Sequence, residues 1–201
     1  MMVKICGTTN REDAQAAIDG GATALGFIFY PNSPRYISPE DAARIIEAFP
    51  SGVWKVGVFV NEPPARVAEV ALRLGLDVAQ LHGEEKPEAL PRGIRVWKAF
   101  RVGPAFRMSQ IEPYEAEAFL LDSFSEKAFG GTGRTFDWQL ARGATRNIIV
   151  SGGLDAANVE AAIREARPWG VDACSRLEIS PGQKDHKKMA QFLKAALSAT
   201  P

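Results

Sequence analysis

The feature that most constrains the fold of this chain is an eightfold alternation of short apolar runs with polar, helix-patterned stretches. The apolar runs are rich in β-branched residues, which is typical of strands buried on both faces. Such runs, when they alternate with helices, predict βαβ units and a parallel sheet. We expect strands at about Val3 to Cys6, Ala24 to Phe29, Trp54 to Val60, Val78 to His82, Arg95 to Phe100, Ala118 to Asp122, Asn147 to Ser151 and Val171 to Ser175.

Helical patterns separate the apolar runs and are clearest at five places. These are Arg11 to Asp19, Pro39 to Ala48, Pro64 to Leu74, Ala156 to Ala166 and Asp185 to Leu197. Gly21, Gly75 and Gly170 precede three of the strands, where a glycine in the left-handed conformation commonly ends a helix. No G-x-G-x-x-G follows the first strand, as the alternative of an open dinucleotide-binding sheet would need. We therefore predict an α/β chain that forms one (β/α)8 barrel over residues 1–201, with short connections.

The bulk properties of the chain favour one domain with a small-molecule partner. Its 201 residues are 46% hydrophobic, enough for one substantial core. The 24 basic and 24 acidic residues balance, which argues against nucleic acid or an anionic membrane surface as a partner. The first residues lack a long apolar segment, so we expect a cytoplasmic protein. The oligomeric state is left open, and a monomer is compatible with the sequence.

The cysteines and histidines indicate neither disulfides nor a metal site. Cys6 and Cys174 are the only cysteines, and we expect both to be reduced thiols. His82 and His186 are the only histidines, and neither stands in a spacing typical of zinc ligands. We expect no metal.

Polar residues follow several of the predicted strands, and in a barrel of this kind the active site lies at those strand ends. Cys6 ends the first strand and Asp122 the sixth, Gly152 and Gly153 follow the seventh, Cys174 and Ser175 close the eighth, and Arg35 lies in the loop after the second. Around the ring these strands are numbers six, seven, eight, one and two. The residues therefore form one contiguous arc of the mouth.

The loop Ser151-Gly152-Gly153-Leu154-Asp155 is a candidate phosphate site. Its small residues allow backbone N–H groups to approach an anion before a helix begins. Barrels often bind phosphate after strands seven and eight, and Ser175 adds a donor from the eighth. The alternative is an ordinary turn.

Cys6 and Asp122 are candidates for proton transfer. Lys4 and Cys6 are two residues apart and face the same side of a strand, and an ammonium near a thiol favours the thiolate. Asp122 ends an apolar run, where burial favours a neutral carboxyl that can donate a proton. The alternatives are an inert core thiol with Lys4 paired to a carboxylate, and a capping carboxylate. Arg35, between a proline and an aromatic residue, suggests a guanidinium for a planar anion or else a solvated surface arginine.

Taken together, the motifs resemble those of the phosphoribosylanthranilate isomerase family along the whole chain. They are Lys4-Ile5-Cys6-Gly7, Gly26-Phe27-Ile28-Phe29, Ser33-Pro34-Arg35, Val58-Phe59-Val60-Asn61, Gln80-Leu81-His82-Gly83, Leu120-Leu121-Asp122-Ser123, Gly130-Gly131-Thr132-Gly133, Phe136-Asp137-Trp138, Ser151-Gly152-Gly153-Leu154 and Ser180-Pro181-Gly182 with Lys184-Asp185. Few of these motifs are specific alone, but the ordered set is.

The resemblance implies an Amadori rearrangement of a phosphorylated aminosugar in tryptophan biosynthesis. It implies that Cys6 is the general base, Asp122 the general acid and Arg35 the contact for the anthranilate carboxylate. Gly152, Gly153, Cys174 and Ser175 would then form the phosphate cradle. The substrate nitrogen supplies the electron push, so no cofactor is implied.

Two positions depart from the family pattern. The family usually has serine or asparagine where this chain has Cys174, a weaker donor, and a small residue where it has Arg176. Arg176 would either contact phosphate or crowd the pocket. Alternatives for the whole chain are a catalytically silent phosphate-binding barrel and another sugar-phosphate enzyme, such as ribulose-phosphate epimerase or indole-glycerol-phosphate synthase. The irregular stretch Ser123 to Thr135 suggests a mobile loop.

Overall fold

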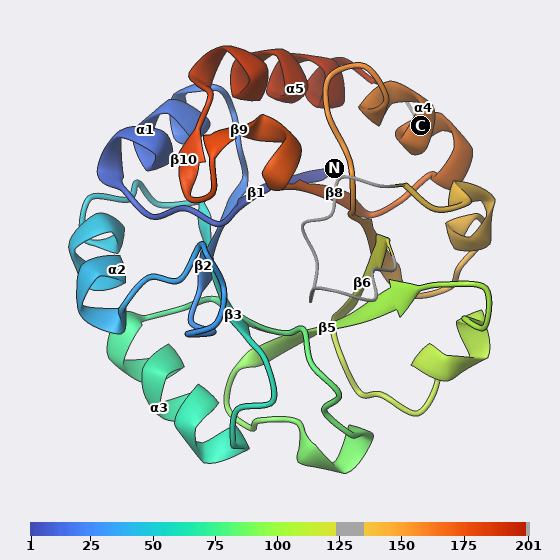
Figure 1. The fold of residues 1–201 in the computed structure, drawn as a ribbon. Coiled ribbons are helices and arrows are strands. Elements are labelled where there is room, and N and C mark those ends of the chain that lie inside the picture. The colour runs from blue at the N-terminus through green and yellow to red at the C-terminus, as the bar shows by residue number, and fades with distance from the viewer. Residues whose placement is uncertain (124–134, 200–201) are drawn as a thin grey trace.

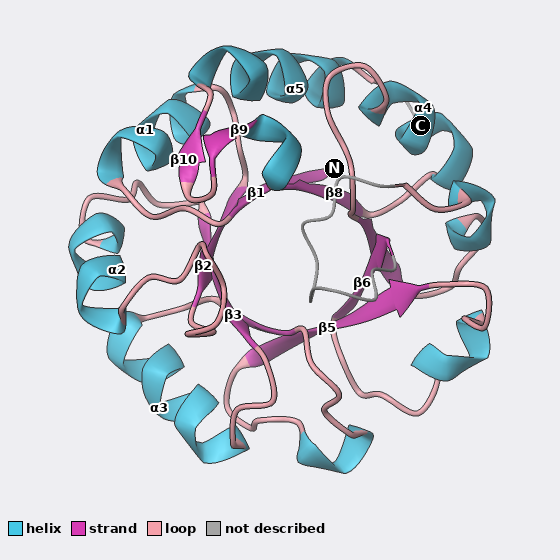
Figure 2. Ribbon diagram, viewed as in Figure 1, coloured by secondary structure: helices cyan, strands magenta, loops and turns pink. Residues whose placement is uncertain are grey.

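The computed structural model describes residues 1–123 and 135–199, and in it eight parallel strands close into a barrel in the order β1 to β8 (Figures 1 and 2). The predicted barrel is therefore confirmed, and the open sheet is wrong. The strands are β1 (Met2–Cys6), β2 (Ala24–Ile28), β3 (Trp54–Phe59), β4 (Val78–Leu81), β5 (Arg95–Val102), β6 (Ala118–Ser123), β7 (Asn147–Val150) and β8 (Gly170–Ala173). The predicted mobile loop falls largely on residues 124–134, which lie outside the described residues.

Within residues 1–123 and 135–199, five α-helices surround the barrel, at the five places where the sequence pattern was clearest (Figure 2). They are α1 (Arg11–Asp19), α2 (Pro39–Ile46), α3 (Pro64–Leu74), α4 (Val159–Ala166) and α5 (His186–Ser198). Helix α4 begins three residues later than predicted, because residues 156–158 form turns that close the loop after β7.

Short 3-10 turns occupy several positions where a barrel of this kind ordinarily has helices. They are η1 (Pro87–Ala89), η2 (Met108–Ile111), η3 (Trp138–Ala141) and η4 (Ser175–Leu177). Within the described residues, the connections after β4, β5 and β6 contain η1, η2 and η3 and no α-helix. These short connections explain how eight strands fit in a chain shorter than the usual length of about 250 residues.

Two of the three predicted left-handed glycines are confirmed. Gly21 and Gly75 have φ of 92° and 57°. Gly170 was a wrong prediction, because α4 ends instead at Arg167, a non-glycine residue with φ of 47°. Gly170 begins β8 and packs against β1, where an added Cβ would lie 2.5 Å from Met2 Cε.

The buried apolar residues form two clusters. One lies inside the barrel and includes Val56, Trp97 and Leu120, all fully buried. The larger cluster lies between the strands and the outer helices. Because side chains alternate along each strand, the residues between those of the larger cluster face the barrel axis. The polar side chains of the mouth lie at the end of this interior where the strands have their C-terminal ends.

A small hairpin that the sequence did not predict follows β8. It consists of β9 (Glu178–Ser180) and β10 (Gln183–Lys184), antiparallel to each other. Thr9, after β1, donates a hydrogen bond to the Gly182 carbonyl in the turn. The hairpin therefore lies over the loops that follow the first two strands, next to the mouth (Figure 1).

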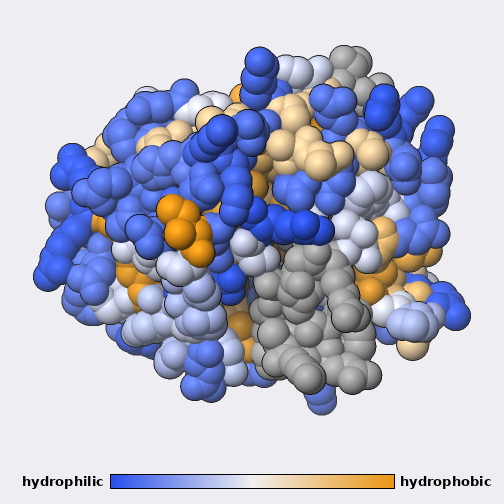
Figure 3. Space-filling view, turned by 45° about the horizontal axis from the view of Figure 1, so that its top comes forward, coloured by the Kyte–Doolittle hydropathy of each residue, from blue (hydrophilic) through white to orange (hydrophobic). Residues whose placement is uncertain are grey.

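The face of the molecule in Figure 3 is largely hydrophilic, with small, separated hydrophobic groups. Large apolar side chains with high exposure are scattered over several elements, as Leu72 on α3 and Ile179 on β9 illustrate. Among the described residues, no helix has the length and apolar character needed to cross a membrane.

Candidate active site

A cavity of about 70 Å³ lies at the C-terminal mouth of the barrel and brings together four of the predicted site residues. Cys6, Arg35, Asp122 and Cys174 line it. The remaining lining residues are Ile28, Tyr30, Ser33, Val58, Val60, Gln80, His82, Ser151 and Asp172. Strands two, six and eight thus meet strand one around a single space, as the ring order requires.

A larger cavity of about 520 Å³ lies beside the first, between the loops that follow β4 and β5. Its walls include Lys98, Phe100, Phe106 and Tyr114, and none of the predicted site residues. His82 lines both cavities. We place the chemistry in the smaller cavity, because it contains both candidate proton-transfer groups.

The thiol of Cys6 has a neighbourhood that favours its ionised form. A hydrogen bond with the Cys174 thiol lowers the pKa of Cys6 to about 6, although burial opposes this shift. The Lys4 ammonium lowers the pKa further, and the Asp172 carboxylate opposes it. These neighbours favour the thiolate, the form of Cys6 that can accept a proton.

Lys4 is fully buried in the barrel interior, on the same side of β1 as Cys6. Its Nζ lies 2.7 Å from Asp172 Oδ1, and Ser151 donates to Asp172 Oδ2 at 3.0 Å. Burial would lower the pKa of Lys4, but Asp172 and Cys6 outweigh burial and raise it. The sequence offered a core carboxylate or a thiolate as the partner of Lys4, and the lysine serves both.

Gly26 on β2 makes room for this cluster. It is in register with Cys6, and a Cβ at this position would lie 2.8 Å from Cys6 Sγ and 3.0 Å from Lys4 Cε. A glycine within a buried strand is a sign of such close approach, so Gly26 is a signal that sequence reasoning could have used.

Asp122 follows the apolar run of β6, one residue before the strand ends, and is 2% exposed. Its Oδ2 lies 3.3 Å from His82 Nε2, while Oδ1 is buried without a hydrogen-bond partner among the described residues. Asp122 lines the cavity that Cys6 also lines, and its contact there is with His82.

Arg35 is not a solvated surface arginine. Its Nε lies 2.9 Å from Glu178 Oε1 and its Nη2 lies 2.8 Å from Glu178 Oε2, in a forked ion pair. Lys184 Nζ lies 2.9 Å from Glu178 Oε1. Burial would raise the pKa of Glu178, but Arg35 and Lys184 lower it. The pair uses Nε and Nη2 of Arg35, and Arg35 also lines the mouth cavity.

The loop after β7 has the close backbone approach that its glycines suggested. Gly152 and Gly153 have φ of 85° and 66°. A Cβ on Gly152 would lie 2.5 Å from the backbone nitrogen of Ser123 and 2.6 Å from Asp122 Oδ1. The loop therefore packs directly against the end of β6, and only glycine fits at position 152.

Cys174 and Arg176 flank the predicted phosphate residue Ser175 but face different neighbours. Cys174 contacts Cys6, and that contact raises the pKa of Cys174, so its thiol remains a donor. Arg176 is directed outward, where its Nη1 lies 3.3 Å from Asp155 in the loop after β7. Arg176 therefore links the two loops of the predicted cradle and does not fill the mouth.

Sequence reasoning assigned no role to several residues that complete the site. Gln80, His82 and Asp172 line the mouth cavity, Glu178 pairs with Arg35, and Lys184 pairs with Glu178. The motifs that contain His82 and Lys184 were identified, but the contacts of these residues depend on the ring closure and on the unpredicted hairpin.

Comparisons with known proteins agree along the full chain. The sequence model of the family described as N-(5'phosphoribosyl)anthranilate (PRA) isomerase matches residues 3–195. The N-(5'-phosphoribosyl)anthranilate isomerase of Solibacter usitatus (strain Ellin6076) is 54% identical and covers 99% of this chain and 98% of its own length. The crystal structure of phosphoribosyl anthranilate isomerase from Thermotoga maritima has a TM-score of 0.88 with 42% identity over 98% of each chain.

One similar crystal structure contains a ligand. It is a phosphoribosyl anthranilate isomerase in complex with reduced 1-(o-carboxyphenylamino)-1-deoxyribulose 5-phosphate. It is 41% identical to this chain, covers 98% of each chain and has a TM-score of 0.84.

Proposed function

The chain belongs to the N-(5'-phosphoribosyl)anthranilate isomerase family, and we propose that Cys6 and Asp122 are the general base and general acid of its reaction. The reaction is the Amadori rearrangement of N-(5-phosphoribosyl)anthranilate to 1-(2-carboxyphenylamino)-1-deoxyribulose 5-phosphate, a step of tryptophan biosynthesis. The observation that carries the assignment is a buried carboxyl and a thiol with a pKa of about 6 on the same small cavity.

The proposed proton transfers use opposite sides of the mouth. Asp122 protonates the furanose ring oxygen, and the anilino nitrogen pushes the ring open to a Schiff base. The Cys6 thiolate then removes the proton at C2′, and the resulting enolamine tautomerises to the ketose. β1 and β6 are three steps apart in the ring of eight strands, which supports a substrate held between the two groups.

The two anionic ends of the substrate need separate sites. The ligand bound to the relative carries a phosphate and a carboxyphenyl group. We assign the phosphate to the backbone around Gly152, Gly153, Cys174 and Ser175. We assign the carboxylate to Arg35, which lines the cavity and whose guanidinium is held by Glu178. A cation fixed in this way loses little side-chain freedom when the ligand binds.

The chemistry of the proposed base favours one kind of cellular compartment. Cys6 acts only as a free thiol or thiolate, and Cys174 lies against it. A reducing compartment keeps such thiols unpaired, which supports the cytoplasmic location expected from the sequence. The partner is a small phosphorylated aminosugar and neither nucleic acid nor membrane.

Steady-state turnover of N-(5'-phosphoribosyl)anthranilate by the purified full chain tests the proposal. We expect saturable turnover without added cofactor. A folded protein that binds inorganic phosphate without turning over this substrate would instead be a silent barrel. Turnover of ribulose 5-phosphate, or of the carboxyphenylamino ketose to an indole, in place of this reaction would identify another sugar-phosphate enzyme.

A further inference from the structure

His82 directly follows β4 and lies on the boundary between the two cavities. Its side chain is 11% exposed, and its Nε2 lies 3.3 Å from Asp122 Oδ2. Nε2 is buried and forms no aligned hydrogen bond with the described residues, and Asp122 Oδ1 is unpartnered in the same way. Gln80 Oε1, from a third residue that lines this cavity, also has no partner among the described residues. Buried unpartnered polar atoms are costly, so three of them in residues around one cavity indicate groups that are used when the reaction takes place.

Gln80 determines which nitrogen of the His82 ring carries the proton. It is fully buried on β4, and its Nε2 lies 3.1 Å from His82 Nδ1. With the amide in this orientation its nitrogen donates and Nδ1 accepts, which places the proton of a neutral ring on Nε2. The N–H group of His82 therefore faces Asp122.

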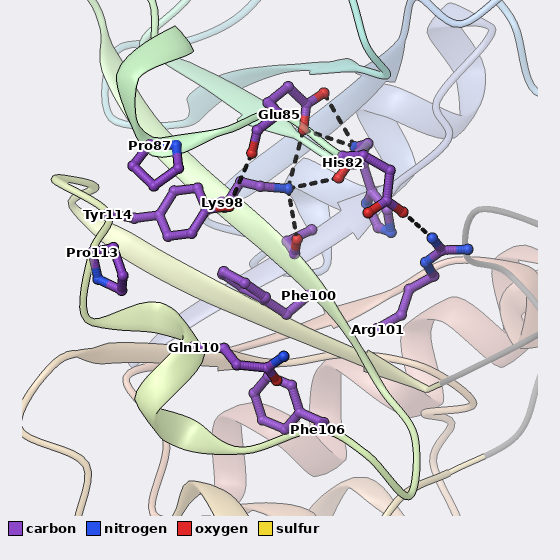
Figure 4. A pocket seen from close by; sticks show the side chains of 13 residues that line it. His82, Glu85, Pro87, Lys98, Phe100, Arg101, Phe106, Gln110, Pro113 and Tyr114 are labelled. Carbon is purple, nitrogen blue, oxygen red and sulfur yellow. Dashed lines mark hydrogen bonds and ion pairs between the residues drawn. The ribbon is translucent and has the colours of Figure 1, made fainter.

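The loop that carries His82 is fixed by buried charges. Glu85 accepts hydrogen bonds from the backbone nitrogens of Asn61 at 2.8 Å and Gly83 at 3.0 Å. Lys98, from β5, lies 3.0 Å from Glu85 Oε2 and donates to the Gly83 carbonyl at 2.8 Å. Figure 4 shows Lys98 between Glu85 and the residues next to His82. The backbone on either side of the imidazole is held, so the ring cannot easily turn away from Asp122.

We propose that His82, held as its Nε2–H tautomer by Gln80, is a positioning residue that stabilises the carboxylate of Asp122 when Asp122 gives its proton to the substrate. In this step the O–H bond at Oδ1 breaks, the proton moves to the ring oxygen, and the electron pair stays on the carboxylate. His82 Nε2–H then donates to Oδ2 and keeps its own proton. The inference rests on the proposed role of Asp122.

The arrangement favours the charge that develops during the step. In the proposed role Asp122 carries its proton before the transfer, so Nε2–H then faces an uncharged oxygen without an aligned hydrogen bond. After the transfer it faces an anion, to which hydrogen bonds are stronger. A donor fixed beforehand at the site of a developing charge lowers the barrier, and removal of one such donor typically costs about 10² to 10³ in kcat.

Paired substitutions test the proposal in the full chain. We expect His82→Leu to lower kcat by about 10²-fold with little change in KM, since the donor acts on the transition state. His82→Gln, which retains an N–H donor, should restore part of kcat. His82→Leu should have no further effect in an Asp122→Asn background, because His82 acts through Asp122.

Nitrogen NMR of histidine-labelled protein measures the tautomer of the His82 ring directly. The proposed role requires one particular tautomer, whereas a merely structural role of His82 does not. Only His82 and His186 contribute signals, and His186→Asn assigns them and serves as the control with unchanged turnover. His82 should be the Nε2–H tautomer in the wild type, and Gln80→Met should mix the tautomers and lower kcat.

An Nδ1–H tautomer in the wild type, or near-normal kcat in a folded His82→Leu variant, would overturn the inference. If either of these results came with an inactive Asp122→Asn variant, the proposed role of His82 would be wrong while the role of Asp122 would stand. If the wild type itself did not turn over the substrate, the proposed function would fail instead.

Discussion

At the scale of single residues, the neighbours of Cys6 favour the ionised form of a buried thiol, which the proposed role as general base requires. A free cysteine in a protein core is usually inert. Here the hydrogen bond from Cys174 and the charge of Lys4 outweigh burial and hold the pKa of Cys6 near 6. Cys174 therefore lowers the pKa of Cys6, in addition to its proposed place at the phosphate end.

The pH dependence of activity should follow this thiol. Because the base must be deprotonated, kcat/KM should rise as the pH rises through about 6. Cys174→Ala removes the largest cause of the low pKa, so the rise should move to higher pH, whereas Cys174→Ser keeps a donor and should move it less. A rise at the same pH in wild type and Cys174→Ala would contradict this account of Cys6.

At the scale of elements, the sequence predicted strands and helices well where a pattern extends over a whole element. Helices α1 and α3 have the predicted limits, because their apolar spacing and flanking residues agree. The β9–β10 hairpin was missed, since β9 and β10 have three and two residues and no alternating pattern. The contact of this hairpin with Arg35 depends on the position of the end of β8, from which the hairpin follows.

The connection after β4, which contains the 3-10 turn η1, is tied to the barrel by a buried ion pair. Lys98 and Glu85 form a buried ion pair with side chains 3% and 5% exposed. Burial lowers the pKa of Lys98 although Glu85 opposes it. The pair joins β5 to the loop that carries His82.

Loss of this pair should destabilise the fold. Lys98→Met leaves the Glu85 carboxylate buried without its cation, which typically costs about 3–5 kcal/mol of unfolding free energy. Urea titration followed by circular dichroism measures this loss. The matched control is Arg66→Met, which breaks an exposed pair with Glu69 on α3 and should have little effect. Equal effects of the two substitutions would contradict a special role for the buried pair.

Arg176 links the loops after β7 and β8, and its substitution tests the phosphate end. We expect Arg176→Gly to raise KM more than it lowers kcat, because the cradle binds the phosphate in both ground and transition states. Asp155→Asn, which breaks the same contact but keeps the cation, separates loop alignment from charge. A large loss of kcat with unchanged KM would count against a phosphate-side role.

At the scale of the whole molecule, ring closure is what makes the site predictable. Strand ends that are far apart in sequence meet at one mouth, so Cys6, Arg35, Asp122 and Cys174 could be grouped from strand order alone. Side-chain pairing within the mouth could not be predicted. The Arg35–Glu178 pair and the His82–Asp122 contact each depend on distances of a few ångströms that a strand order does not fix.

The central claim is that Cys6 and Asp122 move the protons of the isomerisation from opposite sides of the mouth. The most direct test is the kcat of Cys6→Ser and Asp122→Asn with N-(5'-phosphoribosyl)anthranilate, alongside circular dichroism to establish that each variant is folded. Each substitution should lower kcat by about 10² to 10⁴, the usual contribution of one positioned acid or base. A folded variant of either kind that keeps near wild-type kcat would contradict the account.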